Sequence, residues 1–122
     1  MSKVVLIVED EKVLQDVYKL VLSSKGFDVH TADNGFDGLQ KLKVVNPDLV
    51  LLDIFMPIMD GKEFMRNIDI ANYPDTKIVV FSNLSDVETQ KEMLDLGAKK
   101  FVLKSTMAPQ DLVTLVQDMD KY

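Results

Sequence analysis

The chain contains no cysteine and a single histidine, His30, among its 122 residues. The lack of cysteine excludes disulfides and thiolate metal sites, and one histidine cannot form a multi-histidine zinc site. Basic residues are also in deficit, since 20 acidic residues against 14 basic ones give a net charge of −6. Because nucleic acid is bound by basic surfaces, we expect no direct nucleic-acid partner.

Long apolar runs are absent as well. No run approaches the ~20 residues of a membrane span, so no membrane association is expected. The first apolar run, Val4–Val8, is short for a secretory signal and is followed at once by the acids Glu9, Asp10 and Glu11. We therefore expect a cytoplasmic protein.

The remaining composition is that of one globular domain. Hydrophobic residues make up 47% of the chain and charged residues 28%. A single domain over residues 1–122 fits this length, since domains commonly hold ~100–200 residues. Folding of such a chain buries about two-thirds of its surface, which is enough for a real core.

Short apolar runs alternate with stretches of helical spacing. The predicted strands are Val4–Val8, a weaker run at Phe27–Thr31, Leu49–Leu52, Ile78–Phe81 and Phe101–Leu103. In the first helical stretch the apolar positions are Val13, Leu14, Val17, Leu20 and Val21. The alternation predicts five β-α units.

Capping residues and breakers mark the predicted helix ends. Helices are expected to end at Gly26, Asn46-Pro47 and Gly97. Capping boxes at Asp60–Glu63 and Ser85–Glu88, and Pro109 in a first turn, are expected to begin the last three helices.

Five β-α units with strands apolar on both faces predict an α/β fold. The sheet should be parallel and covered by helices on both sides, with right-handed crossovers. The common result is a doubly wound five-stranded sheet of order 2-1-3-4-5. Ligands bind such sheets beyond the carboxyl ends of the strands, beside the junction of the first and third strands.

Carboxylates collect at that junction. Glu9 and Asp10 follow the first predicted strand, and Asp53 follows the third. Any one of them alone would be interpreted as a solvated loop residue or a helix cap. Together they would repel one another, and a hard cation such as Mg²⁺ would remove that cost.

Two further polar residues should reach the same edge of the sheet. Ser82 ends the fourth strand and Lys104 follows the fifth. Solvated strand ends are the plain alternative for both. With a metal and Asp53, however, the set fits phosphoryl transfer to a carboxylate, with Asp53 as the nucleophile, Lys104 neutralising charge and Ser82 binding an oxygen.

These residues also carry a family resemblance, which spans essentially all 122 residues. Val-Glu-Asp-Glu at 8–11, Leu-Leu-Asp-Ile-Phe-Met-Pro-Ile-Met-Asp-Gly at 51–61, Ser82, and Gly-Ala-Lys-Lys-Phe-Val-Leu-Lys at 97–104 carry it. The chain resembles the receiver domain of two-component response regulators, as found in chemotaxis regulators, and the resemblance implies their flavodoxin-like fold.

The resemblance implies a phosphorylation site. Asp53 would accept a phosphoryl group from the phosphohistidine of a sensor histidine kinase or a phosphotransfer protein. Glu9, Asp10, Asp53 and the backbone carbonyl of Phe55 would bind Mg²⁺. The chain would be no enzyme beyond catalysing its own phosphorylation and dephosphorylation.

The resemblance also implies a conformational switch. Ser82 would move to bind the phosphoryl group, and Phe101 would follow it inward. The fourth helix, fifth strand and fifth helix would form the output face toward a downstream target or output domain, or toward a second copy of the chain in a dimer. Val113, Val116 and Met119 would supply apolar contacts there, although some must face the core.

The sequence departs from the family pattern at three positions. Ser105 follows Lys104, where the family usually has proline, so we expect a trans bond and a longer connection over Ser105–Ala108. Phe55 and Leu84 are apolar, whereas polar residues there can orient a hydrolytic water. We expect a long-lived phosphoryl group, unless both side chains turn away from the site.

Three other functions are compatible with this fold class. A flavin-binding electron carrier needs a phosphate-binding loop after the first strand, where Glu9–Glu11 would repel phosphate. An aspartate-dependent phosphohydrolase needs a second acid, which Phe55 cannot replace. A degenerate receiver that acts only as a binding module remains open, as does the question of whether the chain is complete or part of a longer protein; the Met1 start favours a complete N-terminal unit.

Overall fold

The computed structural model describes residues 2–83 and 86–122, and its strands form one parallel sheet. The strands are β1 (Val4–Val8), β2 (Asp28–Ala32), β3 (Leu49–Leu52), β4 (Lys77–Ser82) and β5 (Lys100–Leu103). Their order is β2-β1-β3-β4-β5, with all pairs parallel. This confirms the predicted fold class and strand order. The weakest prediction, Phe27–Thr31, is displaced by one residue.

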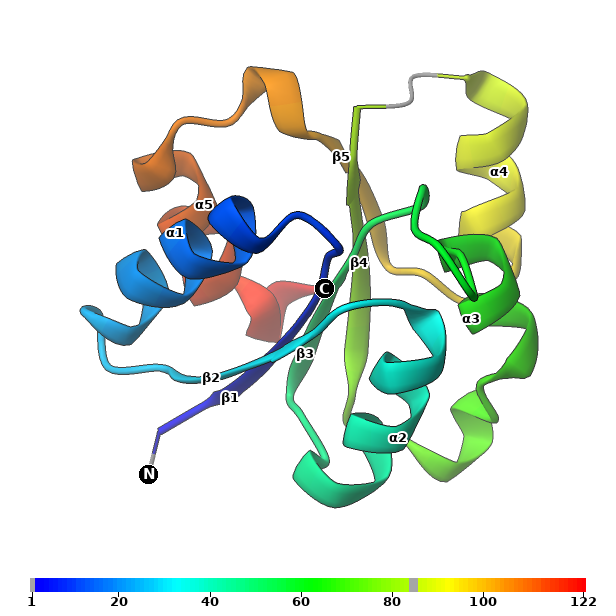
Figure 1. The fold of residues 1–122 in the computed structure, drawn as a ribbon, viewed down its shortest axis with the longest axis horizontal. Helices are drawn as coiled ribbons and strands as arrows, with labels where there is room; N and C mark the ends of the chain where they lie inside the picture. The colour runs from blue at the N-terminus through cyan, green and yellow to red at the C-terminus, as the bar shows by residue number, and fades with distance from the viewer. Residues whose placement is uncertain (1, 84–85) are drawn as a thin grey trace.

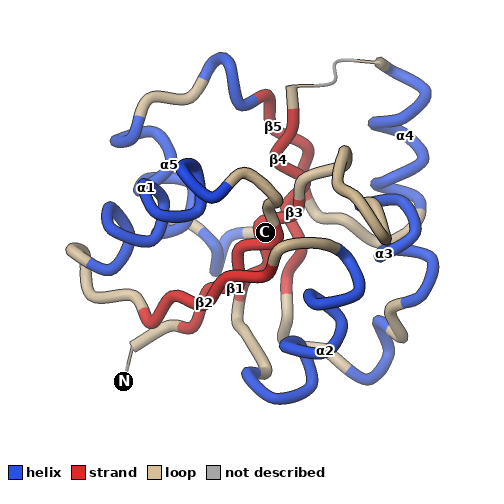
Figure 2. The backbone as a smooth tube through the Cα atoms, viewed as in Figure 1, coloured by secondary structure: helices blue, strands red, loops and turns tan. Residues whose placement is uncertain are grey.

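Helices cover both faces of the sheet. They are α1 (Lys12–Ser23), α2 (Gly35–Val45), α3 (Gly61–Asn67), α4 (Val87–Asp95) and α5 (Pro109–Gln117), with short 3₁₀ turns η1 (Ile70–Asn72), η2 (Lys104–Thr106) and η3 (Met119–Lys121). Figure 1 shows α1 and α5 on one side of the sheet and α2, α3 and α4 on the other. The strands form a single layer between them in Figure 2. Within the described residues, the helices are too short or too polar to cross a membrane.

Most predicted helix ends are confirmed. Asn46 ends α2 with a left-handed φ of 47°, and Asp60 begins α3 by accepting a hydrogen bond from the Glu63 amide. Pro109 is the first residue of α5. Asp86 caps α4 through the Glu88 amide, whereas the predicted cap Ser85 lies outside the described residues.

The core lies in two layers, one on each side of the sheet. Val5 and Ile7 face α1 and α5, whereas Leu6 and Val8 face the other three helices. Val113, Val116 and Met119 are all buried in the first layer. The expectation that these three residues supply surface contacts on an output face is therefore wrong: this is the apolar stripe that anchors α5 and the turn after it.

A close backbone approach fixes the loop between β3 and α3. The Gly61 amide donates to the Ile54 carbonyl over 2.8 Å. A Cβ at Gly61 would overlap the carbonyl oxygen of Asp53 and lie 2.8 Å from the Ile54 Cα. Glycine is needed here because the start of α3 presses against the backbone of Asp53.

We predict that Gly61→Ala lowers the free energy of unfolding by about 3 kcal/mol, since rigid backbone atoms must move. Gly38→Ala is the matched control, because its Cβ would meet side-chain atoms of Val8 and Phe64 at 3.1–3.2 Å. Its crowding is partly offset by better helix propensity, so the loss should be about 1 kcal/mol. Urea unfolding measures both; an equal loss at the two positions would contradict the backbone argument.

Candidate phosphorylation site

Three carboxylates meet beyond the ends of β1 and β3. The register pairs Val8 with Leu52, so the residues that follow these strands are neighbours. One oxygen each of Glu9, Asp10 and Asp53 lies within 4.8 Å of the others. Glu9 is buried, with 2% of its surface exposed, whereas Asp10 is exposed. The structure thus brings together the three acids singled out in the sequence.

Lys104 bridges two of these acids. Its Nζ donates to Glu9 Oε2 over 2.7 Å and to Asp53 Oδ2 over 3.1 Å. The lysine side chain is only 10% exposed. A partly buried ammonium shared by two carboxylates is a strong electrostatic contact, because water screens it poorly.

The environment raises the pKa of both Glu9 and Lys104, which favours the neutral form of the acid and the charged form of the lysine. Burial, and next the neighbouring Asp53 carboxyl, raise the pKa of Glu9 to about 7. Burial alone would lower the pKa of Lys104, but the hydrogen bond to Glu9 and the charges of Asp53 and Glu9 hold that pKa above its usual range. The lysine is therefore cationic at neutral pH, and Glu9 exchanges its proton near neutrality.

The cluster is chemically able to hold a metal ion. Glu9 Oε1 is buried and has no hydrogen-bond partner in the structure. It belongs to a set of carboxylate oxygens that carries more negative charge than Lys104 can balance. Such an all-oxygen set suits a hard divalent cation.

The acids open into a small pocket that also contains the other candidate residues. The pocket has a volume of about 210 Å³. Its lining residues are Asp10, Glu11, Leu14, Asp53, Phe55, Ser82, Asn83 and Lys104. Ser82 is buried, whereas Phe55 is 64% exposed. Phe55 therefore borders the site, and Leu84 lies outside the described residues.

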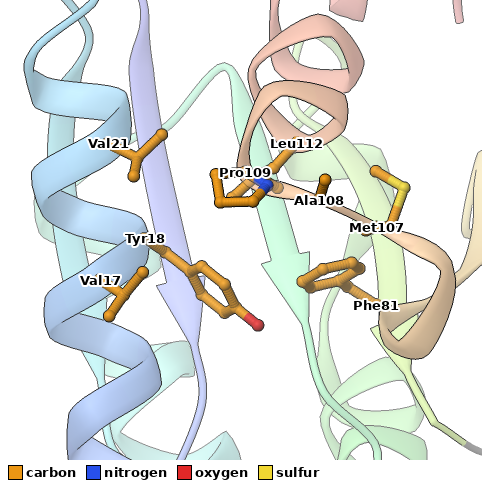
Figure 3. Close-up of a pocket in the computed structure, with 8 residues that line it drawn as sticks. All are labelled: Val17, Tyr18, Val21, Phe81, Met107, Ala108, Pro109 and Leu112. Carbon is orange, nitrogen blue, oxygen red and sulfur yellow. The ribbon is translucent and has the colours of Figure 1, made fainter.

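An aromatic pair supports the lysine from behind. Lys104 Nζ lies 5.9 Å from the centroid of the Phe81 ring, and Phe81 meets Tyr18 edge to face at 5.5 Å. Both rings line a cavity of about 50 Å³ between α1 and α5, shown in Figure 3. Val17, Tyr18 and Val21 of α1 line this cavity together with Phe81 of β4, so the aromatic pair lies between the lysine and α1.

The buried face of α1 differs from the one that hydrophobicity predicts. Val13 and Leu20 are 73% and 72% exposed, although the sequence predicts both on the apolar face. The buried face instead includes Gln15 and Leu22. Gln15, Tyr18 and Leu22 share helical spacing, which indicates this face, but hydrophobicity does not place a glutamine in the core.

The connection after β5 follows the sequence prediction. The Lys104–Ser105 peptide bond is trans, and α5 begins after Ala108. The η2 turn (Lys104–Thr106) lies within this connection. Phe101 lies partly buried against the core layer that includes Met93. The structure thus shows where the candidate switch residue lies, and its movement stays a prediction.

Comparison with known proteins places these features in a family. The chain is 38% identical over 103 residues to the chemotaxis protein CheY of Treponema pallidum, covering 82% of this chain and 71% of that protein. It is 33% identical over 100 residues to the cell cycle transcriptional regulator CtrA of Caulobacter vibrioides, covering 82% and 43%. The chain spans about half the length of the first curated relatives it matches.

The fold comparison agrees. A crystal structure of a CheY-like receiver domain protein from Methanospirillum hungatei superimposes with a TM-score of 0.91 at 27% identity, covering 99% of this chain and 96% of that one. The model of the response regulator receiver domain matches residues 5–117. The chain belongs to the response regulator receiver domain family.

Proposed function

We propose that this receiver domain accepts a phosphoryl group on Asp53 from a phosphohistidine of a sensor histidine kinase or a phosphotransfer protein. The observation that carries the proposal is the Lys104 ammonium, which bridges Asp53 and Glu9 inside the acidic pocket. A lysine held against a carboxylate in this way can neutralise the charge of a phosphoryl group that arrives on that carboxylate. Phe55 lines the same pocket and is exposed, so the donor would approach Asp53 beside this ring.

The transfer needs no other covalent group of the protein. An oxygen of Asp53 forms a bond to phosphorus, the P–N bond of the phosphohistidine breaks, and its electron pair stays on the donor's imidazole nitrogen. Asp53 is oriented by the Ile54 amide, which donates to its Oδ1 over 2.8 Å. The Lys104 ammonium and the Ser82 hydroxyl are suited to bind phosphoryl oxygens.

The acidic cluster fits Mg²⁺ as the resident ion. Glu9, Asp10 and Asp53 would hold it with the backbone carbonyl of Phe55, and the partnerless Glu9 Oε1 supports this assignment. When bound, the ion supplies neutralisation of the charge on the transferring oxygens.

Two of the other functions are less compatible with this pocket. A flavin phosphate would face Glu9 and Asp10 rather than a nest of amides, and would be repelled. A phosphohydrolase would need an acid or base at position 55, where an apolar ring borders the pocket. A degenerate receiver is distinguished from an active one only by phosphorylation.

We predict that treatment with acetyl phosphate and Mg²⁺ adds about 80 Da, the mass of one phosphoryl group, and that Asp53→Asn abolishes the gain. Intact mass spectrometry measures it, and a chelator should prevent it. Asp60→Asn is the matched control, because asparagine also caps helices and α3 should keep its start. A modification that persists in Asp53→Asn, or that forms unchanged in the chelator, would overturn the assignment.

We further propose that phosphorylation changes the face formed by α4, β5 and α5, which then acts on a downstream target or output domain or forms a dimer. Ser82 ends β4 and Lys104 follows β5, and Ser82 pairs with Leu103 in the sheet. A shift of either side chain would therefore move both strand ends. Phe101 on β5 packs against the core layer that contains Met93 of α4, which gives the shift a path to that helix. If Phe101 has two alternative packings against this layer, a phosphoryl group on Asp53 can shift the equilibrium between them.

We predict that phosphorylation shifts the NMR signals of Phe101 and α4, and not only those beside Asp53. Ser82→Ala should still be phosphorylated while the distant shifts shrink, because the hydroxyl that follows the phosphoryl group is lost. Ser105→Ala removes an exposed hydroxyl from the neighbouring loop and should leave the shifts unchanged. Distant shifts that survive fully in Ser82→Ala would count against this coupling.

We predict a long-lived phosphoryl group, because the apolar ring of Phe55 lines the pocket and cannot orient a hydrolytic water. Phe55→Asn should speed autodephosphorylation about tenfold, since orientation of a reactant supplies much of catalysis. Phe36→Asn, at an exposed phenylalanine on α2, is the control. Loss of the label followed over time decides: equal rates in wild type and Phe55→Asn would show that the lifetime is set elsewhere.

A further inference from the structure

Gln15 is a fully buried polar residue in the first turn of α1. It has 0% of its surface exposed, and it lies four residues after Glu11, whose carbonyl accepts the Gln15 backbone amide over 3.0 Å. Its side-chain Nε2 donates to the backbone carbonyl of Glu9 and, over 2.8 Å, to Asp33 Oδ1. The Ala32 carbonyl lies 3.4 Å from the same nitrogen.

The groups around the Gln15 side-chain amide determine which of its ends faces them. The carbonyls of Glu9 and Ala32 and the carboxylate of Asp33 are all acceptors. Only the NH₂ end of the glutamine can face them, and its Oε1 is left without a partner. The amide directs its two N–H donors at three surrounding acceptors while its own oxygen is left without a partner, so this side chain is specialised for donating.

These contacts fix the loop that carries two of the three clustered acids. The Glu9 amide donates to the Ala32 carbonyl over 3.0 Å, so Gln15 completes the restraint by binding the Glu9 carbonyl. Asp33, the third neighbour, is itself anchored by its amide to Asp37 of α2 over 3.1 Å. Gln15 thus ties the Glu9–Glu11 loop to the start of α1 and to the end of β2.

We propose that Gln15 is a positioning residue for the metal site: it holds the Glu9–Asp10 backbone in the geometry that binds the divalent cation, without touching the ion or the phosphoryl group. This inference rests on the proposed function, since it assigns a role toward the same ion. Residues that orient metal ligands in this way contribute strongly to affinity, and their loss weakens metal binding about 10- to 100-fold.

The test compares Mg²⁺ dissociation constants by calorimetry. Gln15→Met has nearly the same volume but no donor, and should bind Mg²⁺ about tenfold more weakly. Gln15→Glu should also bind more weakly, because a carboxylate opposes three acceptors. The added negative charge of this glutamate would by itself strengthen Mg²⁺ binding. Weaker binding therefore indicates a loss of positioning, and tighter binding indicates an electrostatic effect alone.

The control is Thr76→Val, which removes a side-chain hydrogen bond of 2.6 Å to the Pro47 carbonyl before β4, at the other end of the sheet. It should lose stability without losing Mg²⁺ affinity. Thermal unfolding of each variant shows whether an affinity change merely follows a stability change.

A second readout uses the metal-free protein. Hydrogen exchange at the Asp10 and Glu11 amides should be faster in Gln15→Met than in wild type or Thr76→Val. If wild type fails to bind Mg²⁺, the proposed function is wrong, and the exchange rates still decide whether Gln15 orders the loop. Unchanged exchange and wild-type Mg²⁺ affinity in Gln15→Met, or tighter binding in Gln15→Glu, would overturn the inference.

Discussion

The contact on which the site depends is the lysine that joins the ends of three strands. Lys104 follows β5, yet its ammonium lies against Glu9 after β1 and Asp53 after β3, residues 95 and 51 positions away in the chain. Removal of the lysine would leave two largely buried carboxylates facing each other without a counter-charge, which is strongly unfavourable. The apolar sheet can carry this polar centre only because the lysine, or a cation in its place, compensates the acids.

The apolar surroundings make that compensation effective. Phe81, which Tyr18 meets edge to face, excludes water from one side of the lysine, and Glu9 lies at the end of a fully apolar strand. A charged group that is removed from water must either pair with an opposite charge or change its protonation state. The raised pKa of Glu9 is an example of the second case. Gln15 addresses the same problem for uncharged groups by satisfying backbone carbonyls that folding removes from water.

The features of the site that follow from strand order can be predicted from the sequence, whereas those that depend on side-chain packing cannot. The convergence of Glu9, Asp10 and Asp53 follows from topology alone, because the carboxyl ends of neighbouring parallel strands meet at one edge. The buried face of α1 could not be read from hydrophobicity, since Gln15 is polar and Val13 is exposed. The outward role given to Val113 failed for the opposite reason: an apolar helix face serves the core before it serves a partner. The bridge from Lys104 to Glu9 depends on side-chain reach and rotamer, which spacing does not encode.

The same bridge suggests how a local chemical event could reach the rest of the domain. In the described structure Lys104 divides its donors between Glu9 and Asp53, which are also proposed ligands of the cation. A divalent ion would take over the neutralisation of these acids, and the lysine would then be free to follow negative charge that appears on Asp53. Because the lysine begins the η2 turn directly after β5, a change of its partner acts on the strand that carries Phe101. Glu9 and Asp53 would hold the ion, which supplies neutralising charge when bound, and the phosphoryl oxygens on Asp53 would then be the stronger partner for Lys104.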